Sequence, residues 1–327
     1  MNKNSSTPLL TIGILSWNRL HYLRSTLESA RRCIQYPNLQ WIVVDNLSEE
    51  TGLADYLKSC TWIDELVFLK SDHVTAMNEI LARTRGEVLL LWPDDMQFIV
   101  AGDWMSGCVE ILLENSWLGS LGLSCLRRAT LQKKFRMPLW QNPRSILSEL
   151  KWFGRQFRFP RQLTSSTGLN FQTFGWREDG IIGSGIPSLT RTEVWKTLGN
   201  WKAPGGTNLN DSSGGGEDEM TKRWRHSGHA WHRAIPMLPV AADILTDPLG
   251  TKAKVRKNIR YGVYAPPPEG TIYYEILPQA EAEKLPRQGQ PLAFEELVRP
   301  LGFPLPLDEH GDLLKAGINL EIAEEIK

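Results

Sequence analysis

The chain has 327 residues, of which 41% are hydrophobic and 23% charged, a composition that excludes a disordered or fibrous protein and predicts a folded one. Its 37 basic and 37 acidic side chains balance, so no global field favours nucleic acid or an anionic membrane as a partner. No apolar run approaches the roughly 18 residues of a membrane span, and the four cysteines form no Cys-x-x-Cys pair. We therefore expect reduced thiols, no signal peptide and no anchor, in the cytoplasm.

The N-terminal part of the chain alternates between strand and helix patterns. Apolar runs of strand length cover residues 9–16, 40–44, 65–69 and 87–92. Apolar side chains recur at helical spacing in residues 20–34, after the potential cap Asn18, and in residues 74–85, where Gly86 is expected to end the helix. This alternation predicts an α/β protein with a mostly parallel sheet flanked by helices.

Polar residues follow several of the predicted strands. Ser16 ends the first run, Asp45 follows the second, and the pair Asp94-Asp95 follows the fourth. Open parallel sheets bind ligands outside the carboxyl ends of their strands. Adjacent carboxylates there can hold a divalent ion that bridges the phosphates of a sugar diphosphate and offsets charge on the leaving group. The alternative is an ordinary Asp-Asp surface turn.

A second acidic cluster follows three glycines, as Glu217-Asp218-Glu219. Helix-forming residues come next, so the acids would open a helix whose dipole favours negative charge at that end, which by itself explains them. The functional interpretation makes one of them a general base, which contributes roughly 10²- to 10⁴-fold by taking a proton from an acceptor hydroxyl.

These motifs, in this order, resemble the family 2 glycosyltransferases of GT-A fold. The residues that carry the resemblance are TIGILSWNR (11–19), IVVDNLS (42–48), Gly86-Glu87 leading to Asp94-Asp95, and GED (216–218). The resemblance covers about residues 8–264. It implies inverting transfer of a sugar from a nucleotide-diphosphate sugar to a hydroxyl group, with Mn²⁺ or Mg²⁺ as cofactor. The acceptor would be a glycan, a lipid-linked molecule or another hydroxyl compound, as in polysaccharide biosynthesis.

The resemblance also implies a role for each matching residue. Residues implied on the donor side are Ser16 and Asn18 in the nucleotide pocket, Asp45 on the base, Asn78 near the phosphates, Asp94 on the ribose side and Asp95 on the metal. Two positions depart from the family pattern: Met77 stands where an arginine often precedes the asparagine, and Pro93 stands where the first aspartate often lies.

On the acceptor side, the resemblance implies Asp218 as the catalytic base and Glu217 as a positioning acid. Trp201 matches the stretch that supports the acceptor. Many members supply a metal-binding histidine just after a later strand. In this chain that strand is predicted for residues 239–245 and is followed by Asp247, which would either replace the histidine as a metal ligand or simply lie in a turn.

Charge is uneven in the rest of the chain. Residues 127–161 carry ten basic side chains against one acid, interleaved with aromatic residues, which suits peripheral membrane contact, an anionic acceptor, nucleic acid, or a solvated insertion. Residues 265–327 carry twelve acids against five Lys or Arg. We therefore expect a glycosyltransferase domain in residues 1–264, containing the basic insertion, and an acidic, proline-rich extension in residues 265–327.

Two other functions stay open. A nucleotidyltransferase would use two metals and would bind a nucleoside triphosphate, but it has no need of the Glu217-Asp218 cluster. A catalytically degenerate GT-A-like protein would bind nucleic acid or a membrane surface through the basic insertion, although neutral overall charge gives no firm prediction of nucleic-acid binding.

Overall fold

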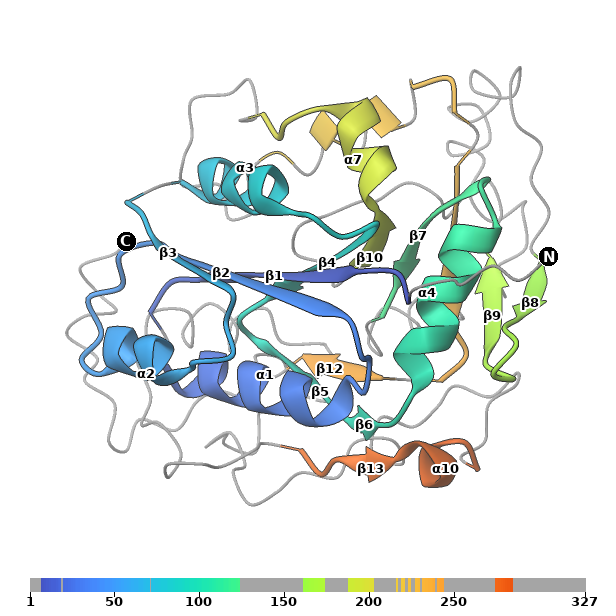
Figure 1. Cartoon of the computed structure of the whole chain (residues 1–327), viewed down its shortest axis with the longest axis horizontal. Helices are drawn as coiled ribbons and strands as arrows, with labels where there is room; N and C mark the ends of the chain where they lie inside the picture. Colours follow the sequence, from blue (N-terminus) through green and yellow to red (C-terminus); the bar gives the residue numbers. More distant parts are fainter. Residues whose placement is uncertain are drawn as a thin grey trace, which may run out of the picture.

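The computed structural model describes residues 7–18, 20–70, 72–123, 161–173, 188–202, 216, 219–220, 223–224, 227–229, 231–238, 240–243 and 274–284. These residues form a three-layer α/β arrangement around one large sheet (Figure 1). The sheet has nine strands in the order β3-β2-β1-β4-β10-β7-β11-β9-β8. Helices lie on both faces, as the alternation of strand and helix patterns predicts.

The strands of the main sheet have the following bounds: β1 (Leu10–Ser16), β2 (Leu39–Asp45), β3 (Glu65–Phe68), β4 (Val88–Pro93), β7 (Leu118–Gly122), β8 (Gln162–Thr164), β9 (Asn170–Thr173), β10 (Ser188–Arg191) and β11 (His232–Pro236). Strands β3, β2, β1 and β4 are parallel neighbours, and β7 is parallel to β11. Strand β10 lies antiparallel between β4 and β7, and β9 runs antiparallel to both of its neighbours. The sheet is therefore mostly parallel, which confirms the predicted fold class.

The helices are α1 (Leu20–Cys33), α2 (Leu53–Ser59), α3 (His73–Arg83), α4 (Trp104–Glu114), α7 (Thr192–Leu198) and the short α10 (Gln279–Ala282). Smaller strands are β5 (Met96–Phe98), β6 (Val100–Ala101), β12 (Ala241–Asp243) and β13 (Leu277–Pro278). Strand β12 pairs with β5 and falls within the strand predicted for residues 239–245.

Helix α3 shows how local sequence sets an element's ends. The Asp72 side chain accepts a hydrogen bond from the Thr75 N–H at 2.7 Å and so caps the first turn. The helix ends at Arg83, before Gly86, which has a different role from the predicted one. A Cβ on Gly86 would lie 2.7 Å from the carbonyl oxygen of Leu9, so glycine is needed there for close approach to the chain entering β1.

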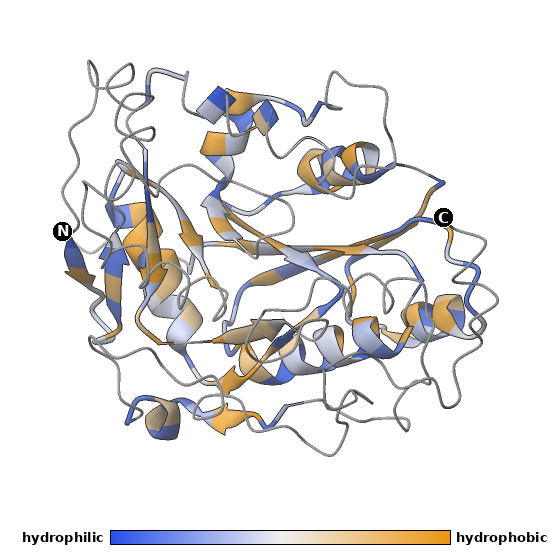
Figure 2. Ribbon diagram, turned by 180° about the vertical axis from the view of Figure 1, so that it is seen from behind, coloured by the Kyte–Doolittle hydropathy of each residue, from blue (hydrophilic) through white to orange (hydrophobic). Residues whose placement is uncertain are grey.

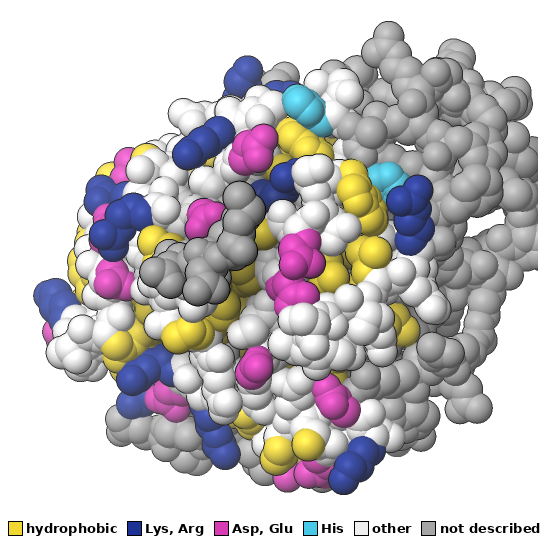
Figure 3. Space-filling model, turned by 45° about the vertical axis from the view of Figure 1, so that its right-hand side comes forward, with side chains coloured by type: hydrophobic (Ala, Val, Ile, Leu, Met, Phe, Trp, Pro, Cys, Tyr) yellow, Lys and Arg dark blue, Asp and Glu magenta, His cyan; other side chains and the backbone are white. Residues whose placement is uncertain are grey.

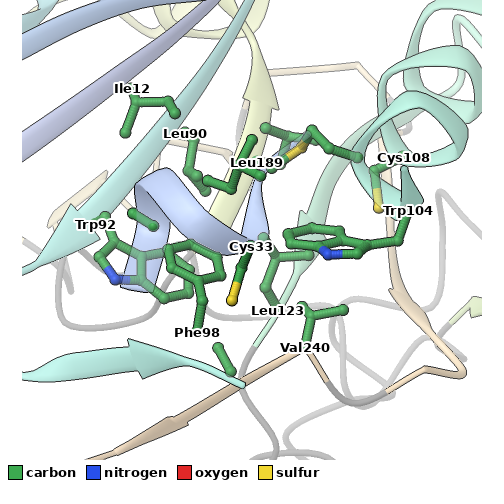
Figure 4. Packing of buried hydrophobic residues seen from close by; sticks show 14 of the residues in the cluster. Ile12, Cys33, Leu90, Trp92, Phe98, Trp104, Cys108, Leu123, Leu189 and Val240 are labelled. Carbon is green, nitrogen blue, oxygen red and sulfur yellow. The ribbon is translucent and has the colours of Figure 1, made fainter. Parts of the chain in front are cut away.

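The pleat of the sheet divides its side chains between two cores. Strand residues such as Ile12, Leu90 and Trp92 face one cluster, which the buried sides of α1 and α4 complete (Figure 4). The alternate residues, such as Val44 and Leu91, face a second cluster against α3 and α7. Figure 2 shows the apolar colouring concentrated on the strands and on the inward sides of the helices. Burial on both faces explains why these strands are continuous apolar runs.

Residues 274–284 pack against the first of these two cores. Strand β13 is parallel to β6, with Leu277 opposite Val100, and the Gln97 side chain exchanges hydrogen bonds with the backbone of Tyr274 at 2.8 and 2.9 Å. Part of the segment predicted as an extension thus lies on the sheet domain. In the part of the chain that the structure describes, no helix is both long and apolar enough to cross a bilayer.

Candidate functional site

The carboxyl ends of three adjacent strands bring the predicted donor residues together. Ser16 at the end of β1 is in register with Asp45 at the end of β2. On the other side, Leu15 is in register with Pro93, so Asp94 begins where β1 reaches Ser16. Since parallel strands end at one edge of the sheet, Ser16, Asp45 and Asp94 form a row across β2, β1 and β4. All three are buried.

Asp45 belongs to a hydrogen-bond network that joins two loops. Its carboxylate accepts the Ser48 N–H at 2.8 Å and the Ser48 hydroxyl at 2.6 Å. The same hydroxyl oxygen accepts the N–H of Asn18 at 2.7 Å. The Asn18 side-chain oxygen in turn accepts the N–H of Glu49 at 3.0 Å, from the loop after β2. The network fixes the loops that follow β1 and β2 relative to each other.

The sequence predicts that Asn18 caps helix α1, but in the structure a different residue binds the first N–H of that helix. Glu50 Oε2 accepts the N–H of Leu20, the first residue of α1, at 2.9 Å. Asn18 itself has a positive φ of 54°, a conformation that asparagine tolerates better than most residues. The loop after β2 therefore helps to begin helix α1.

Asp94 and Asp95 form the turn between β4 and β5, as the sequence predicts. Their exposed fractions are only 5% and 8%. The Thr26 hydroxyl, on α1, donates to the backbone carbonyl of Asp94 at 2.9 Å, and the Trp92 indole N–H donates to the carbonyl of Met96 at 3.0 Å across the turn. These bonds fix the backbone of the turn that carries the two carboxylates.

The donor set at this turn fits a hard divalent cation. Two adjacent carboxylates would supply oxygen ligands, and Mg²⁺ commonly takes its remaining ligands from water and from substrate phosphates. Among the described residues, no three His, Cys, Asp or Glu side chains gather closely enough to hold a metal ion by themselves. Asp247, predicted as a third ligand, lies outside the described residues.

Asn78 and Trp201, two further predicted site residues, are brought together by the structure. The Asn78 side chain on α3 accepts the N–H of Trp201 at 2.7 Å and donates to its carbonyl at 3.0 Å. Trp201 is 2% exposed and packs against Trp195 of α7. The predicted contact of Asn78 with the phosphates stays a prediction, as does the acceptor-side role of Trp201.

The predicted base Asp218 and its neighbour Glu217 lie outside the described residues. Gly216 and Glu219 on either side of them are described. The basic insertion is described at Arg161, the last residue of that segment, whose guanidinium lies over the ring of Trp117. Binding of the basic insertion to a membrane surface, an anionic acceptor or nucleic acid stays a prediction.

The face in Figure 3 intersperses acidic and basic side chains over its described part. Among the described residues, the large hydrophobic side chains that are exposed are Trp17, at 54%, and Leu47, at 48%. Both lie in the loops that follow β1 and β2. Trp17 and Leu47 therefore leave apolar surface exposed on the loops that follow the strand ends carrying Ser16 and Asp45.

Sequence reasoning missed three residues of this edge. Ser48 could have been found from its spacing, because an aspartate side chain often accepts a hydrogen bond from a backbone N–H a few residues away. Glu50 and Thr26 carry no local signal, since each acts on a backbone group distant in sequence.

No protein-family model matches the chain. Among curated proteins it is similar to the uncharacterized protein y4gI of Sinorhizobium fredii (strain NBRC 101917 / NGR234), with 33% identity over 121 residues, or 36% of this chain and 13% of that protein. This chain therefore matches only a small part of that relative.

Among solved structures, the chain is similar to the mannosyltransferase PcManGT from Pyrobaculum calidifontis in complex with GDP-Man and Mn2+, with a TM-score of 0.45 and 16% identity, over 74% of this chain and 59% of that chain. It is also similar to S. aureus TarS 1-349 in complex with UDP-GlcNAc, with a TM-score of 0.44 and 12% identity, over 72% of this chain and 58% of that chain. The chain spans less than two thirds of each of these structures.

Proposed function

We propose that this protein transfers a sugar from a nucleotide-diphosphate sugar to an acceptor hydroxyl. The observation that carries the proposal is the row of Ser16, Asp45 and Asp94, with Asp95 beside it, at the carboxyl edge of β2, β1 and β4. A sugar nucleotide needs polar groups for its base and ribose and carboxylates for a metal-bound diphosphate, and this edge offers both kinds of group.

The donor would lie across the three strand ends. Asp45 would face the base, Ser16 and Asn18 would line the nucleotide pocket, and Asp94 would face the ribose. Trp17, exposed beside them, gives the ligand apolar surface to cover. The bonds to Ser48 hold the Asp45 carboxylate in one orientation, so this part of the edge would be ordered before a ligand binds.

Asp95 would hold Mn²⁺ or Mg²⁺, with Asp94 adjacent, and Asp247 is the proposed further ligand. When bound, the cation would neutralise charge that develops on the diphosphate leaving group. Asp218 would take the proton of the attacking hydroxyl, so that transfer inverts the anomeric centre, while Glu217 would position the acceptor. Trp201 would support the acceptor side.

Binding of donors tests the proposal directly. Calorimetry with UDP, GDP and dTDP sugars, with and without Mn²⁺, is expected to find at least one donor whose affinity rises with the metal. Asp95→Asn should remove the metal-dependent part of the affinity. Asp218→Asn should leave donor binding nearly intact and lower the rate of donor hydrolysis by roughly 10²- to 10⁴-fold.

Asp103→Asn is the matched control. Asp103 is an exposed aspartate at the N-terminus of α4. Its substitution should change neither the metal-dependent donor affinity nor the rate of donor hydrolysis. Failure of every donor to bind, with or without metal, would overturn the proposal. Binding of a nucleoside triphosphate alone would favour nucleotidyl transfer, and binding only to RNA or to anionic vesicles would favour a degenerate binding protein.

A further inference from the structure

Helix α3 is linked to a segment far away in sequence by one side chain. We define the post-α7 segment as Leu198–Lys202, which comprises the last residue of α7 and the four residues that follow it. Within it, Trp201 has both of its backbone polar groups bound by the amide of Asn78, at 2.7 and 3.0 Å. A carboxamide can do this because it carries an acceptor and a donor on one rigid plane. Since Trp201 is buried, loss of the amide would leave its N–H and carbonyl without those partners.

A second side chain, that of Arg223, also holds this segment. The Arg223 guanidinium donates to the carbonyl of Leu198 and, at 2.8 Å, to the carbonyl of Asn200. Helix α7 ends there, with Gly199 at a positive φ of 74°, so these carbonyls lack helical partners. Glu219 fixes the guanidinium by an ion pair at 2.7 Å.

The segment also contacts the chain on both sides of Glu217-Asp218. Gly216, immediately before the acids, lies against Lys202 at a positive φ of 90°, and a Cβ there would collide with the Lys202 carbonyl. Glu219, immediately after them, is held by Arg223. Gly216 therefore lies close to the post-α7 segment, and Glu219 is linked to it through Arg223.

We propose that Asn78 and Arg223 are positioning residues, which hold the post-α7 segment so that the acidic pair is placed correctly relative to the donor. This inference rests on the proposed function. Asn78 supplies the link to the donor half, because α3 packs on the same sheet whose strand ends carry Ser16 and Asp45, and α3 and α7 share one face of that sheet (Figure 1). The proposal gives Asn78 a role that needs no contact with the donor.

The first test measures local order without any ligand. In Asn78→Ala, hydrogen exchange followed by mass spectrometry should be faster in peptides covering residues 198–202 and 219–224. Peptides covering β1 and β2 should exchange as in the unchanged protein. Glu79→Gln, on the same helix, removes only an exterior ion pair with Arg83 and serves as the control. Unchanged exchange in the post-α7 segment would overturn the proposal.

The second test separates positioning from a general loss of structure. With the donor identified by calorimetry, Asn78→Ala should leave its Kd within about threefold and lower the single-turnover rate of donor hydrolysis by about 10- to 100-fold. In an Asp218→Asn background the same substitution should have little further effect, because it acts through the base. Equal losses in both backgrounds would contradict a positioning role.

Conservative variants cover the case in which Asn78→Ala does not fold. Asn78→Asp keeps the acceptor for the Trp201 N–H and loses the donor to its carbonyl, so it should give an intermediate rate. Arg223→Lys retains the charge but not the fork that reaches two carbonyls, and should accelerate exchange in the same peptides. Absence of donor binding in the unchanged protein would refute the proposed function. A normal rate of donor hydrolysis in both Asn78→Asp and Arg223→Lys would refute the positioning role alone.

Discussion

Replacing Ser48 by alanine should destabilise the fold although the side chain is small. The Ser48 hydroxyl donates to the carboxylate of Asp45 at 2.6 Å and accepts the N–H of Asn18 at 2.7 Å. A hydrogen bond to a charged group contributes about 1.5–3 kcal/mol and a neutral one about 0.5–1.5 kcal/mol. Asp45 has no exposed surface, so water cannot easily replace the lost donor. We expect a loss of about 2–4 kcal/mol in the free energy of unfolding.

Urea denaturation at neutral pH measures this loss. Ser48→Thr keeps the hydroxyl and should lose less than about 1 kcal/mol. Ser59→Ala is the control, because Ser59 is exposed and its hydroxyl donates to the backbone carbonyl of Tyr56 within α2, outside the Asp45 network. A Ser48→Ala protein within about 0.5 kcal/mol of the Ser59→Ala protein would refute the reasoning, since the network would then contribute no more than a surface hydroxyl.

Two further outcomes follow from buried groups. Gly13→Ala should lower the free energy of unfolding, measured by urea denaturation, by about 1–3 kcal/mol, because its Cβ would collide with the Cγ2 of Ile80 on α3. Adding Ile80→Leu, which has no branch at Cβ, should restore part of the loss. A Gly13→Ala protein of unchanged stability would contradict this packing. Burial raises the pKa of the Cys33 thiol from 9.0 to about 12, so its stabilising contribution is complete below pH 9 and is lost as pH rises through 12. Between pH 9 and 12 the free energy of unfolding should therefore fall less steeply in Cys33→Ala than in the unchanged protein, by up to about 1.4 kcal/mol per pH unit. An equal slope in the two proteins would contradict the raised pKa of Cys33.

The first half of the sheet could be predicted because its strands are buried on both faces. Continuous apolar runs therefore mark β1, β2 and β4, and the helices between them keep a helical period. Strand β10 has no such signal. Its sequence, Ser-Leu-Thr-Arg, is polar, yet all four residues are buried between β4 and β7. Only tertiary pairing makes it a strand, so local pattern could not reveal it.

The same distinction separates the two parts of the candidate site. Ser16, Asp45 and Asp94 could be predicted because strand ends are visible in the sequence and parallel strands end at one edge. The bond between Asn78 and Trp201 could not, because it joins residues 123 positions apart through a backbone group that has no residue signature. Family resemblance pointed to Asn78 but not to this partner.

Helix α1 gives a physical reason for regarding the edge that carries Ser16, Asp45 and Asp94 as ordered. Its first N–H is bound by Glu50 from the loop after β2, and Thr26 in its second turn holds the carbonyl of Asp94 after β4. The loop after β1 enters the same helix, and Asn18 in that loop is bonded to Ser48. One helix thus ties together the loops after three strands. A ligand at this edge would meet groups already fixed by packing in the largest core, which lowers the entropy lost on binding. Among the described residues, the post-α7 segment is held instead by the side chains of Asn78 and Arg223, so small substitutions there should alter its geometry more readily than that of the strand-end edge.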